Sequence, residues 1–507
     1  MNIFILLLTI YIVAMLYLGY LGSKRAKTVA GYATSNGDVS PFVTAITFAA
    51  CFASAGTYLG VAGQGFAYGI TNVWFWASQW TTCGIILAIV VKRYRRTSKN
   101  LKSVTVADWV ADRYNSQGLR LYLACVSMLQ VLYIASQLVG VGIILNQMIP
   151  AISYKAGVLI SAVVIIIYIS MGGTYAHIYT NVAQGAMMVI ISVIIMLSGF
   201  FLFGNIFAEL PARLSAINPN LAQGLNPSNG GYPTWIHVVG LFVAHFWWAL
   251  NPQLINKATY LKSERDVKKF IFYNAILMFL MSAVVLGGSY TRILVPEGIG
   301  STITGMDNAV PYFVAHVFPT AVSAVFLVVI IAAMMSTCDG ILLYMASVMG
   351  NTMYKELYIK SKIKRGETVD VTEVDKVTMN IMKYSTLLVG FIAAPMAFAK
   401  PANLTVMLWT AAGTIMSSVA GPVCVGIYSK KPSAKAAALG SLGGCLIYSV
   451  LYFGKVIPSV YLCCGIGGLA SVLLTMLGCV IFKPMDQAYV DKIFADTENE
   501  TETAKQI

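Results

Sequence analysis

Two adjacent hydroxyl side chains within a long apolar run are the strongest candidates for ion chemistry. Ser336 and Thr337 follow Ala333 by about one helical turn, so their oxygens and the Ala333 carbonyl lie close together on a helix. A dehydrated sodium ion needs several oxygens, which transporters often supply from unwound backbone and hydroxyl groups. With the backbone carbonyls of Ala50 and Ala53 added, this set would satisfy a sodium ion. The alternative is that both hydroxyls bond only to carbonyls of their own helix.

Of the 20 acidic residues, only Asp339 falls well inside an apolar run. A carboxyl group at membrane depth is costly and marks a functional site by default. Asp339 follows Ser336 by one turn, so it faces roughly the same side as the sodium ligands. It is expected to tune that site electrostatically. Capping a structural hydrogen-bond network, or facing a cytoplasmic exit, remains the alternative.

Two apolar runs contain stretches that are predicted to interrupt their helices. Residues 49–57 are small, and residues 247–253 contain Pro252, which removes a backbone donor and frees a carbonyl one turn earlier. The two interruptions are five spans apart, and an odd separation makes the surrounding repeats antiparallel. This pattern is typical of transporters built from inverted repeats. Pro and Gly are also common in ordinary membrane helices.

The composition requires a membrane around these elements. Of 507 residues, 58% are hydrophobic and 11% are charged, whereas soluble domains are about 25% charged. This excludes soluble enzymes, nucleic-acid binders and secreted disulfide scaffolds. Apolar runs predict an all-α polytopic membrane protein with roughly 13 transmembrane helices. Its single transmembrane domain is expected over residues 1–485, followed by a solvated acidic tail over residues 486–507.

The 34 Lys and Arg residues predict the orientation. With the N-terminus outside, alternating spans place all of them on the cytoplasmic side except Lys155, Arg213, Arg292, Lys400 and Lys455. The net charge of +14 therefore reflects topology rather than a nucleic-acid partner. The C-terminus is expected in the cytoplasm, and the location is the cell membrane.

Other features predict little further chemistry. No zinc spacing, phosphate loop or nucleophile elbow occurs, so we expect no enzyme. The nine cysteines lie in apolar runs and are expected to be small buried hydrophobes. His177, His237 and His316 lie near span ends, where solvated roles are expected. Residues 105–114 are predicted to form an amphipathic helix along the inner surface, and residues 207–232 short external pieces.

The chain resembles the sodium/solute symporter family, whose members import proline, pantothenate, sugars and sialic acid. The resemblance rests on residues 50–60 (ACFASAGTYLG), 105–114, Gly172-Gly173, 251–257 (NPQLINK), 332–343 (AAMMSTCDGILL) and Gly421-Pro422. It implies a leucine-transporter-type fold with a five-plus-five inverted repeat. An extra helix over 3–22 would precede a first repeat over 41–205. A second repeat over 235–428 and two helices over 433–482 would follow.

The resemblance also implies site residues. The sodium ligands would be Ala50, Ala53, Ala333, Ser336 and Thr337, the same five that the chemistry selects. The central cavity would be lined by Thr57, Trp76, Gln79, Gln137, His245, Trp248 and Asn251. Trp247 would be an aromatic inner gate. None of the cavity residues is a Lys or Arg, so a carboxylate would be met by the exposed ends of broken helices.

One position departs from the family pattern. After Gly172-Gly173 the family commonly has Thr-Asp on the next helix, and this chain has Thr180-Asn181. The acid helps form a second sodium site in some relatives, so its loss predicts one sodium per cycle. Asp339 and Asn181 would then only modulate the single site.

These observations favour sodium-coupled uptake of a small polar or anionic organic solute by alternating access. The partners would be the solute, sodium and the lipid bilayer, without nucleic acid, and the protein would function as a monomer. A passive channel or facilitator, or a membrane sensor on the same fold, is the alternative. Concentrative, sodium-dependent uptake would distinguish the first from the others.

Overall fold

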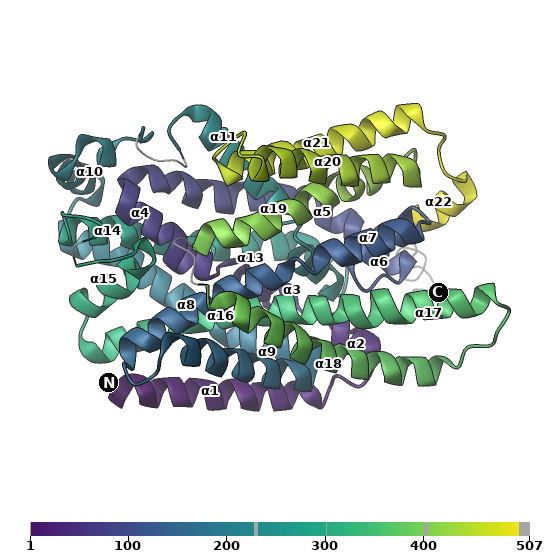
Figure 1. Cartoon of the computed structure of the whole chain (residues 1–507), viewed down its shortest axis with the longest axis horizontal. Helices are drawn as coiled ribbons and strands as arrows, with labels where there is room; N and C mark the ends of the chain where they lie inside the picture. The colour runs from purple at the N-terminus through teal and green to yellow at the C-terminus, as the bar shows by residue number, and fades with distance from the viewer. Residues whose placement is uncertain (1, 228–231, 301, 400–403, 496–507) are drawn as a thin grey trace.

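The computed structural model describes residues 2–227, 232–300, 302–399 and 404–495 and is a bundle of helices that run mainly along one axis (Figure 1). Its long helices are α1 (Asn2–Ser23), α5 (Val73–Leu101), α8 (Gln130–Met148), α9 (Tyr154–Phe203), α13 (Arg265–Ser282), α16 (Thr320–Ser347), α18 (Val371–Ala397), α19 (Leu404–Gly426), α20 (Ala434–Phe453) and α21 (Val460–Ile481). The shorter helices are α2 (Val29–Thr34), α3 (Pro41–Phe52), α4 (Ala62–Tyr68), α6 (Val106–Arg113), α7 (Gln117–Ser127), α10 (Ile206–Ile217), α11 (Trp235–Trp248), α12 (Pro252–Ile255), α14 (Leu286–Leu294), α15 (Ala309–Val317), α17 (Glu356–Lys364) and α22 (Gln487–Phe494).

Within the described residues, ten helical segments are long and apolar enough to cross a membrane, or eleven if the bent pair α11–α12 is one span. The protein is therefore a multi-pass membrane protein. The count is below the predicted 13 because neighbouring spans run together. Helix α9 alone has 50 residues, a length of ~75 Å if straight. It is interrupted at Gly173, whose φ of 51° is a conformation that favours glycine.

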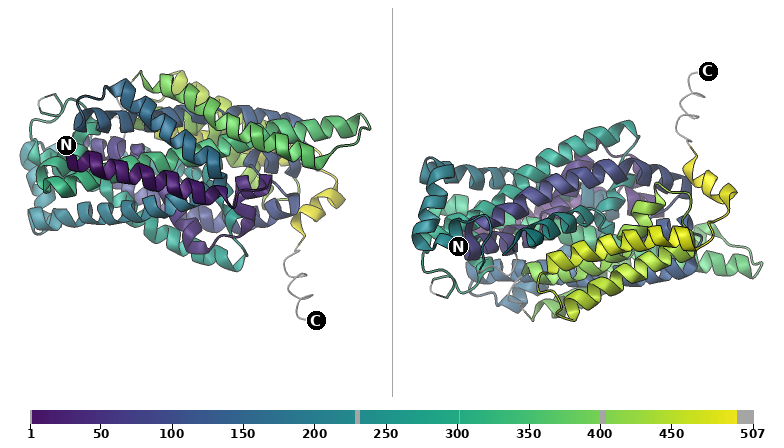
Figure 2. Two further views of the ribbon diagram at one scale, coloured as in Figure 1. Left: turned by 90° about the horizontal axis from the view of Figure 1, so that it is seen from below. Right: turned by 90° about the horizontal axis from the view of Figure 1, so that it is seen from above.

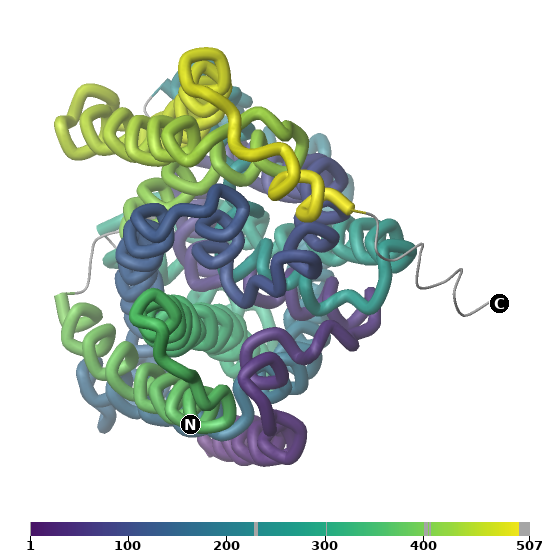
Figure 3. Tube along the Cα trace, turned by 90° about the vertical axis from the view of Figure 1, so that its right-hand side faces the viewer, coloured from purple at the N-terminus to yellow at the C-terminus, as the bar shows by residue number. Residues whose placement is uncertain are grey.

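Burial differs sharply between central and peripheral helices. Every residue of α16 from Phe326 to Ser347 is buried, and the end-on view shows this helix enclosed by others (Figure 3). Helix α1, by contrast, exposes large apolar side chains such as Leu6, Val13 and Tyr17 on the outside of the bundle. Apolar surface outside and polar groups inside is the pattern that a lipid environment requires.

The two ends of the bundle carry different elements. Helix α10 and the N-terminus lie at one end, and α17 and α22 lie at the other (Figures 1 and 2). The segments that the charge pattern predicts to be external therefore share one end. The Lys-rich helix α17 shares the opposite end with the docked helix α22.

Both predicted interruptions are confirmed. Helix α3 ends at Phe52, and Ala53 has an extended backbone with ψ of 99° before a π-helical turn over Gly56–Val61 leads into α4. Helix α11 ends at Trp248. The chain bends by 50° before the helical stretch that begins at Pro252. Small residues in one span and a proline in the other thus break the helices where expected.

Two peripheral predictions are wrong. The amphipathic helix α6 starts at a capping box between Thr105 and Asp108, but it is buried rather than lying on the inner surface, and Trp109 is fully covered. The C-terminal tail is not solvated throughout. Its helix α22 docks on the bundle, where Tyr489 donates to the carbonyl of Asp112 and Asn100 donates to the carbonyl of Ile493. Residues beyond 495 lie outside the described part.

Candidate functional site

The break in α3 lies against the hydroxyl groups of α16. Ser336 Oγ lies 2.9 Å from the carbonyl oxygen of Ala50 and 2.8 Å from that of Ala333. Thr337 Oγ1 lies 3.2 Å from the carbonyl oxygens of Cys51 and Ala333. Both hydroxyls therefore bond within their own helix and also reach across to α3. All five residues are buried, so two hydroxyl and three carbonyl oxygens meet in one protected place.

Cys51 is a contributor that spacing did not predict. The remaining predicted carbonyl belongs to Ala53, which is buried at the point where α3 ends. Its N–H still donates to the Ala49 carbonyl, and no hydrogen bond between described residues joins its carbonyl to the α16 hydroxyls. The carbonyl that Thr337 reaches comes from the last turn of α3. Because a helix end leaves its final carbonyls without intrahelical partners, several neighbouring residues could have supplied it.

A small central cavity lies beside this cluster. Its volume is about 10 Å³, close to the minimum that holds a single water. Bulky aromatic rings close it, with the Trp248 and Trp409 ring centroids 4.2 Å apart. Organic solutes need far more room, so this conformation is closed around the cavity. Its lining residues are Phe52, Ser54, Gly56, Thr57, Val61, Phe75, Gln79, His245, Trp248, Leu408 and Trp409.

Three predicted cavity residues have buried polar atoms without a hydrogen-bond partner among the residues that the structure describes. These atoms are Gln79 Oε1, Trp248 Nε1 and Asn251 Oδ1. Buried polar atoms in native proteins nearly always have partners, because each unpaired one costs about 1–3 kcal/mol. One donor and two acceptors are therefore available around the α3 and α11 breaks. A polar solute, or ordered water in its place, would satisfy them.

Two further predicted residues are already engaged. Gln137 on α8 accepts a hydrogen bond from the Ala55 N–H at 2.7 Å and so holds the α3 break open. His245 lines the cavity, and its Nδ1 lies 2.9 Å from Ser78 Oγ. Thr57 lies in the π-helical turn and also lines the cavity. Gln137 thus supports the shape of the site, while His245 and Thr57 present surface to it.

Trp76 and Trp247 are corrections to the predicted site. Trp76 Nε1 donates to the Phe279 carbonyl at 3.0 Å, and its ring lines a separate apolar cavity near α10 and α14. Trp247 Nε1 donates to the Gly465 carbonyl on α21 at 3.2 Å, so it does not face the cavity as a gate. Consecutive residues of a helix point about 100° apart, so a one-residue difference decides which ring reaches the centre. Trp248 occupies that place.

Asp339 lies at the centre of a buried hydrogen-bond network. His177 Nδ1 is 2.9 Å from Oδ1, and Asn181 Nδ2 is 3.0 Å from both carboxylate oxygens. Tyr168 and Thr180 donate to Oδ2 at 3.3 and 3.1 Å. Asp339 and Asn181, which the sequence named only as possible modulators of the sodium site, are therefore in direct contact. These contacts fit the alternative given for Asp339, namely that it caps a structural hydrogen-bond network.

Two members of this network were assigned to the wrong environment by the sequence. His177 was expected near solvent, but it is fully buried. Lys257 was counted with the cytoplasmic cations, but it is 1% exposed and its Nζ lies 2.5 Å from His177 Nε2. The signal that could have found it was its place five residues after Pro252, inside the broken span. A cation there lies within the bundle.

Comparison with known proteins places this arrangement in a family. The family model "Sodium:solute symporter family" matches residues 32–444. The chain belongs to this family. It is a sodium-coupled symporter of the membrane and not an enzyme.

Relatives of this symporter cover most of its length. It is 23% identical over 475 residues to a sodium/pantothenate symporter of Haemophilus influenzae, covering 91% of this chain and 88% of the relative. A sodium/pantothenate symporter of Escherichia coli is 24% identical over 431 residues, covering 83% and 85%. The match therefore includes both helix breaks and the α16 cluster.

Solved structures share the fold at low sequence identity. The structure of a Na⁺-coupled sialic acid symporter, in a substrate-bound outward-open state, superimposes with a TM-score of 0.76 at 18% identity, covering 96% of this chain and 99% of that one. The nucleobase-cation-symport-1 transporter Mhp1, in a closed conformation, gives 0.57 at 14% identity, with 91% and 98% covered. Both likenesses concern the fold.

The end of the symporter that carries α17 and α22 is held by charged groups. Buried Arg120 lies 2.5 Å from Asp108 and also contacts Asp112. Asn351 Nδ2 donates to Asp108 at 2.9 Å. These contacts join α6, α7 and the turn that follows α16.

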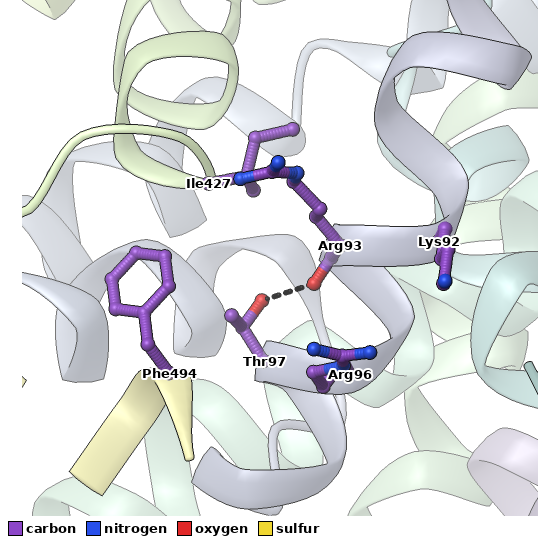
Figure 4. A pocket seen from close by; sticks show the side chains of 6 residues that line it. All are labelled: Lys92, Arg93, Arg96, Thr97, Ile427 and Phe494. Atoms are coloured by element: carbon purple, nitrogen blue, oxygen red, sulfur yellow. Dashed lines mark hydrogen bonds between the residues drawn. The ribbon is translucent and has the colours of Figure 1, made fainter. Parts of the chain in front are cut away.

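A hollow of about 330 Å³ at the same end is separate from the central cavity. Figure 4 shows Arg93 and Thr97 on one helix, joined by a hydrogen bond from Thr97 Oγ1 to the Arg93 carbonyl, with Phe494 of α22 opposite. The neighbouring Arg96 donates to Glu264 and thereby holds the pKa of that carboxyl below its usual range. The residues that line this hollow are Lys92, Arg93, Arg96, Thr97, Ile427 and Phe494.

Proposed function

We propose that this symporter imports a small polar or anionic organic solute with one sodium ion per cycle, by alternating access. The observation that carries the proposal is the meeting of Ser336 and Thr337 with the carbonyls of Ala50, Cys51 and Ala333 at the break of α3. Neutral oxygens suit a cation that must bind and leave again in each cycle. Family membership supports sodium as that cation.

The sodium ligands are the hydroxyls of Ser336 and Thr337 and the carbonyls of Ala50, Ala53 and Ala333, with the Cys51 carbonyl as a further donor. In the closed structure the two hydroxyl protons bond to carbonyls. When sodium binds, these protons turn away and the hydroxyl lone pairs face the ion. Uncharged oxygen ligands replace the water that the ion loses. Because they carry no net charge, they do not bind the ion too tightly for it to be released.

The solute occupies an enlarged form of the central cavity, between the α3 and α11 breaks. The unpaired atoms of Gln79, Trp248 and Asn251 support this location, because a solute would restore their hydrogen bonds. The names of the relatives favour organic acids as the first class to test, namely pantothenate and sialic acid. The cavity of about 10 Å³ must expand to admit either one.

The proposed architecture is a five-plus-five inverted repeat within roughly 13 transmembrane helices. The first repeat covers 41–205 and the second 235–428, with a helix before them and two after. The breaks at Ala53 and Asn251 support it, since they lie in the first spans of the two proposed repeats. The N-terminus lies outside and the C-terminus in the cytoplasm, as the charge pattern favours.

The proposal is tested by reconstituting the purified protein in vesicles. A screen of candidate acids by thermal unfolding, in sodium and in choline, identifies a ligand through its stabilisation of the native state. Uptake of that ligand is then measured with and without an inward sodium gradient. Accumulation above the external concentration only with the gradient supports symport. Equal uptake under both conditions would indicate a passive facilitator.

A further inference from the structure

The buried charges beside the α16 hydroxyls form a chain of three side chains. Asp339 lies on α16, His177 on α9 and Lys257 in the helical turn Asn256–Tyr260 that follows α12. All three are at most 1% exposed. A single uncompensated charge at this depth would be very costly. A positive and a negative group joined through one imidazole satisfy each other.

The charges of the Asp339 carboxylate and the Lys257 ammonium set the direction of the hydrogen bonds to the imidazole between them. The carboxylate of Asp339 can only accept, so His177 Nδ1 carries the hydrogen and donates across 2.9 Å. The other ring nitrogen, Nε2, is then an acceptor, and it faces the Lys257 ammonium at 2.5 Å. A neutral imidazole therefore connects the ammonium to the carboxylate. Each group has the partner that its charge requires.

The chain lies directly beside the proposed sodium ligands. The Lys257 side chain also contacts the thiol of Cys51, and the Cys51 carbonyl is the one that Thr337 reaches. Asp339 is two residues after Thr337 on the same buried helix. The Lys257 ammonium is therefore a cation held against Cys51, whose carbonyl belongs to the place where sodium is proposed to bind.

We infer that Lys257 is a built-in counter-cation of Asp339, which takes the place of a second sodium ion and limits the symporter to one sodium per cycle. The inference rests on the proposed function and assigns a role to a residue outside the proposed ligand set. An acid near a transport site would ordinarily attract a mobile cation. Here a lysine tethered to the chain supplies the positive charge and cannot be transported.

Oxygen ligands for a second ion are present once the ammonium is removed. Asn181 Oδ1 is buried and has no hydrogen-bond partner within the described part of the chain. The hydroxyls of Tyr168 and Thr180 keep lone pairs while they donate to Asp339. A carboxylate, an amide oxygen and two hydroxyls form a hard-oxygen set. In the native protein Lys257 balances the charge of Asp339, so no net negative charge is left to bind a second sodium ion.

The test is the number of sodium ions bound per purified chain, measured with radioactive sodium at constant ionic strength set by choline. Lys257→Gln is expected to bind one ion more than the wild type and to gain a steeper sodium dependence of its unfolding temperature. Lys257→Arg keeps the charge and is the control, with an unchanged count. The double variant Lys257→Gln/Asp339→Asn removes both charges and is expected to return to the wild-type count.

Each outcome bears on the inference alone or on the proposed function alone. A wild type without saturable sodium binding contradicts the proposed function, while the gain of one ion in Lys257→Gln still supports the inference. An equal count in wild type and Lys257→Gln overturns the inference. If Lys257→Gln is too unstable to purify, the double variant is expected to recover folding. Failure of the double variant as well would overturn the charge pairing.

Discussion

Ser336 Oγ lies 2.9 Å from the carbonyl oxygen of Ala50, although 286 residues separate them in the chain. The contact exists because α3 ends two residues after Ala50, while α16 passes the break without interruption. A helix carbonyl near a break has lost part of its intrahelical bonding and is free to bind elsewhere. The proposed sodium site thus depends on a broken helix facing an intact one.

Removing either hydroxyl should weaken sodium activation. Ser336→Ala and Thr337→Ala each delete an oxygen from a dehydrated ion, and a loss of ~1–3 kcal/mol corresponds to a roughly 5- to 150-fold higher half-activating sodium concentration. Thr337→Ser keeps the oxygen and should be milder. Ser347→Ala is the matched control, because Ser347 donates to the Leu343 carbonyl of its own helix at 2.9 Å. Unchanged sodium dependence in both alanine variants would refute the site.

Three cavity substitutions should weaken solute affinity. Gln79→Ala, Asn251→Ala and Trp248→Ala each remove a buried polar atom that awaits a partner, so KM should rise by the equivalent of about 1–3 kcal/mol. Sodium affinity should change only through its coupling to the solute. Trp76→Phe is the control, since its indole faces the Phe279 carbonyl instead. Wild-type KM in all three variants would move the solute elsewhere.

Gly340 on α16 leaves room for Cys51 and His177 to pack closely against this helix. A Cβ atom at this position would collide with Cys51 Sγ and lie 3.0 Å from His177 Cε1. Gly340→Ala should therefore destabilise the protein by about 1–3 kcal/mol through overpacking. Gly84→Ala on α5 is the control, because an added Cβ meets nothing within 4 Å. Thermal unfolding should show a lower midpoint for the first variant alone, and equal midpoints would contradict the packing argument.

Arg120 should matter more than an exposed arginine in a similar pair. Arg120→Gln leaves Asp108 buried beside Asp112 without its cation, and the expected loss is about 3–5 kcal/mol. Arg213→Gln breaks an exposed pair with Glu209 and should cost less than about 1 kcal/mol. Chemical denaturation in detergent compares the two. Similar losses for both variants would show that the buried cluster does not stabilise this end.

The helix breaks were predictable because their cause is local. Small residues before Gly56 and the proline at 252 act on the backbone of their own segment. The α16 hydroxyls were predictable for the same reason, as were the family and the multi-pass helical class. Lys257 and His177 were not, because distance along the chain was taken as depth in the membrane. The chain bends after α11, and α9 is interrupted at Gly173. Lys257 and His177 therefore lie inside the bundle.

The direction of a side chain was the other quantity that spacing did not provide. Trp247 and Trp248 are neighbours with the same chemistry, yet one bonds to Gly465 on α21 and the other faces Trp409. Which ring reaches the cavity depends on the rotation of α11 against its neighbours. That rotation is set by tertiary packing, which no local pattern in the sequence contains.

The proposed role of the α3–α16 cluster is to couple sodium to solute movement. Its most direct test is solute uptake into vesicles that contain either wild-type protein or Ser336→Ala, across a series of sodium gradients. We expect concentrative, sodium-driven uptake by the wild type with a Hill coefficient near one. We also expect the variant to need far more sodium for the same rate. Uptake that is equally fast without sodium, or a sodium response unchanged by Ser336→Ala, would contradict it.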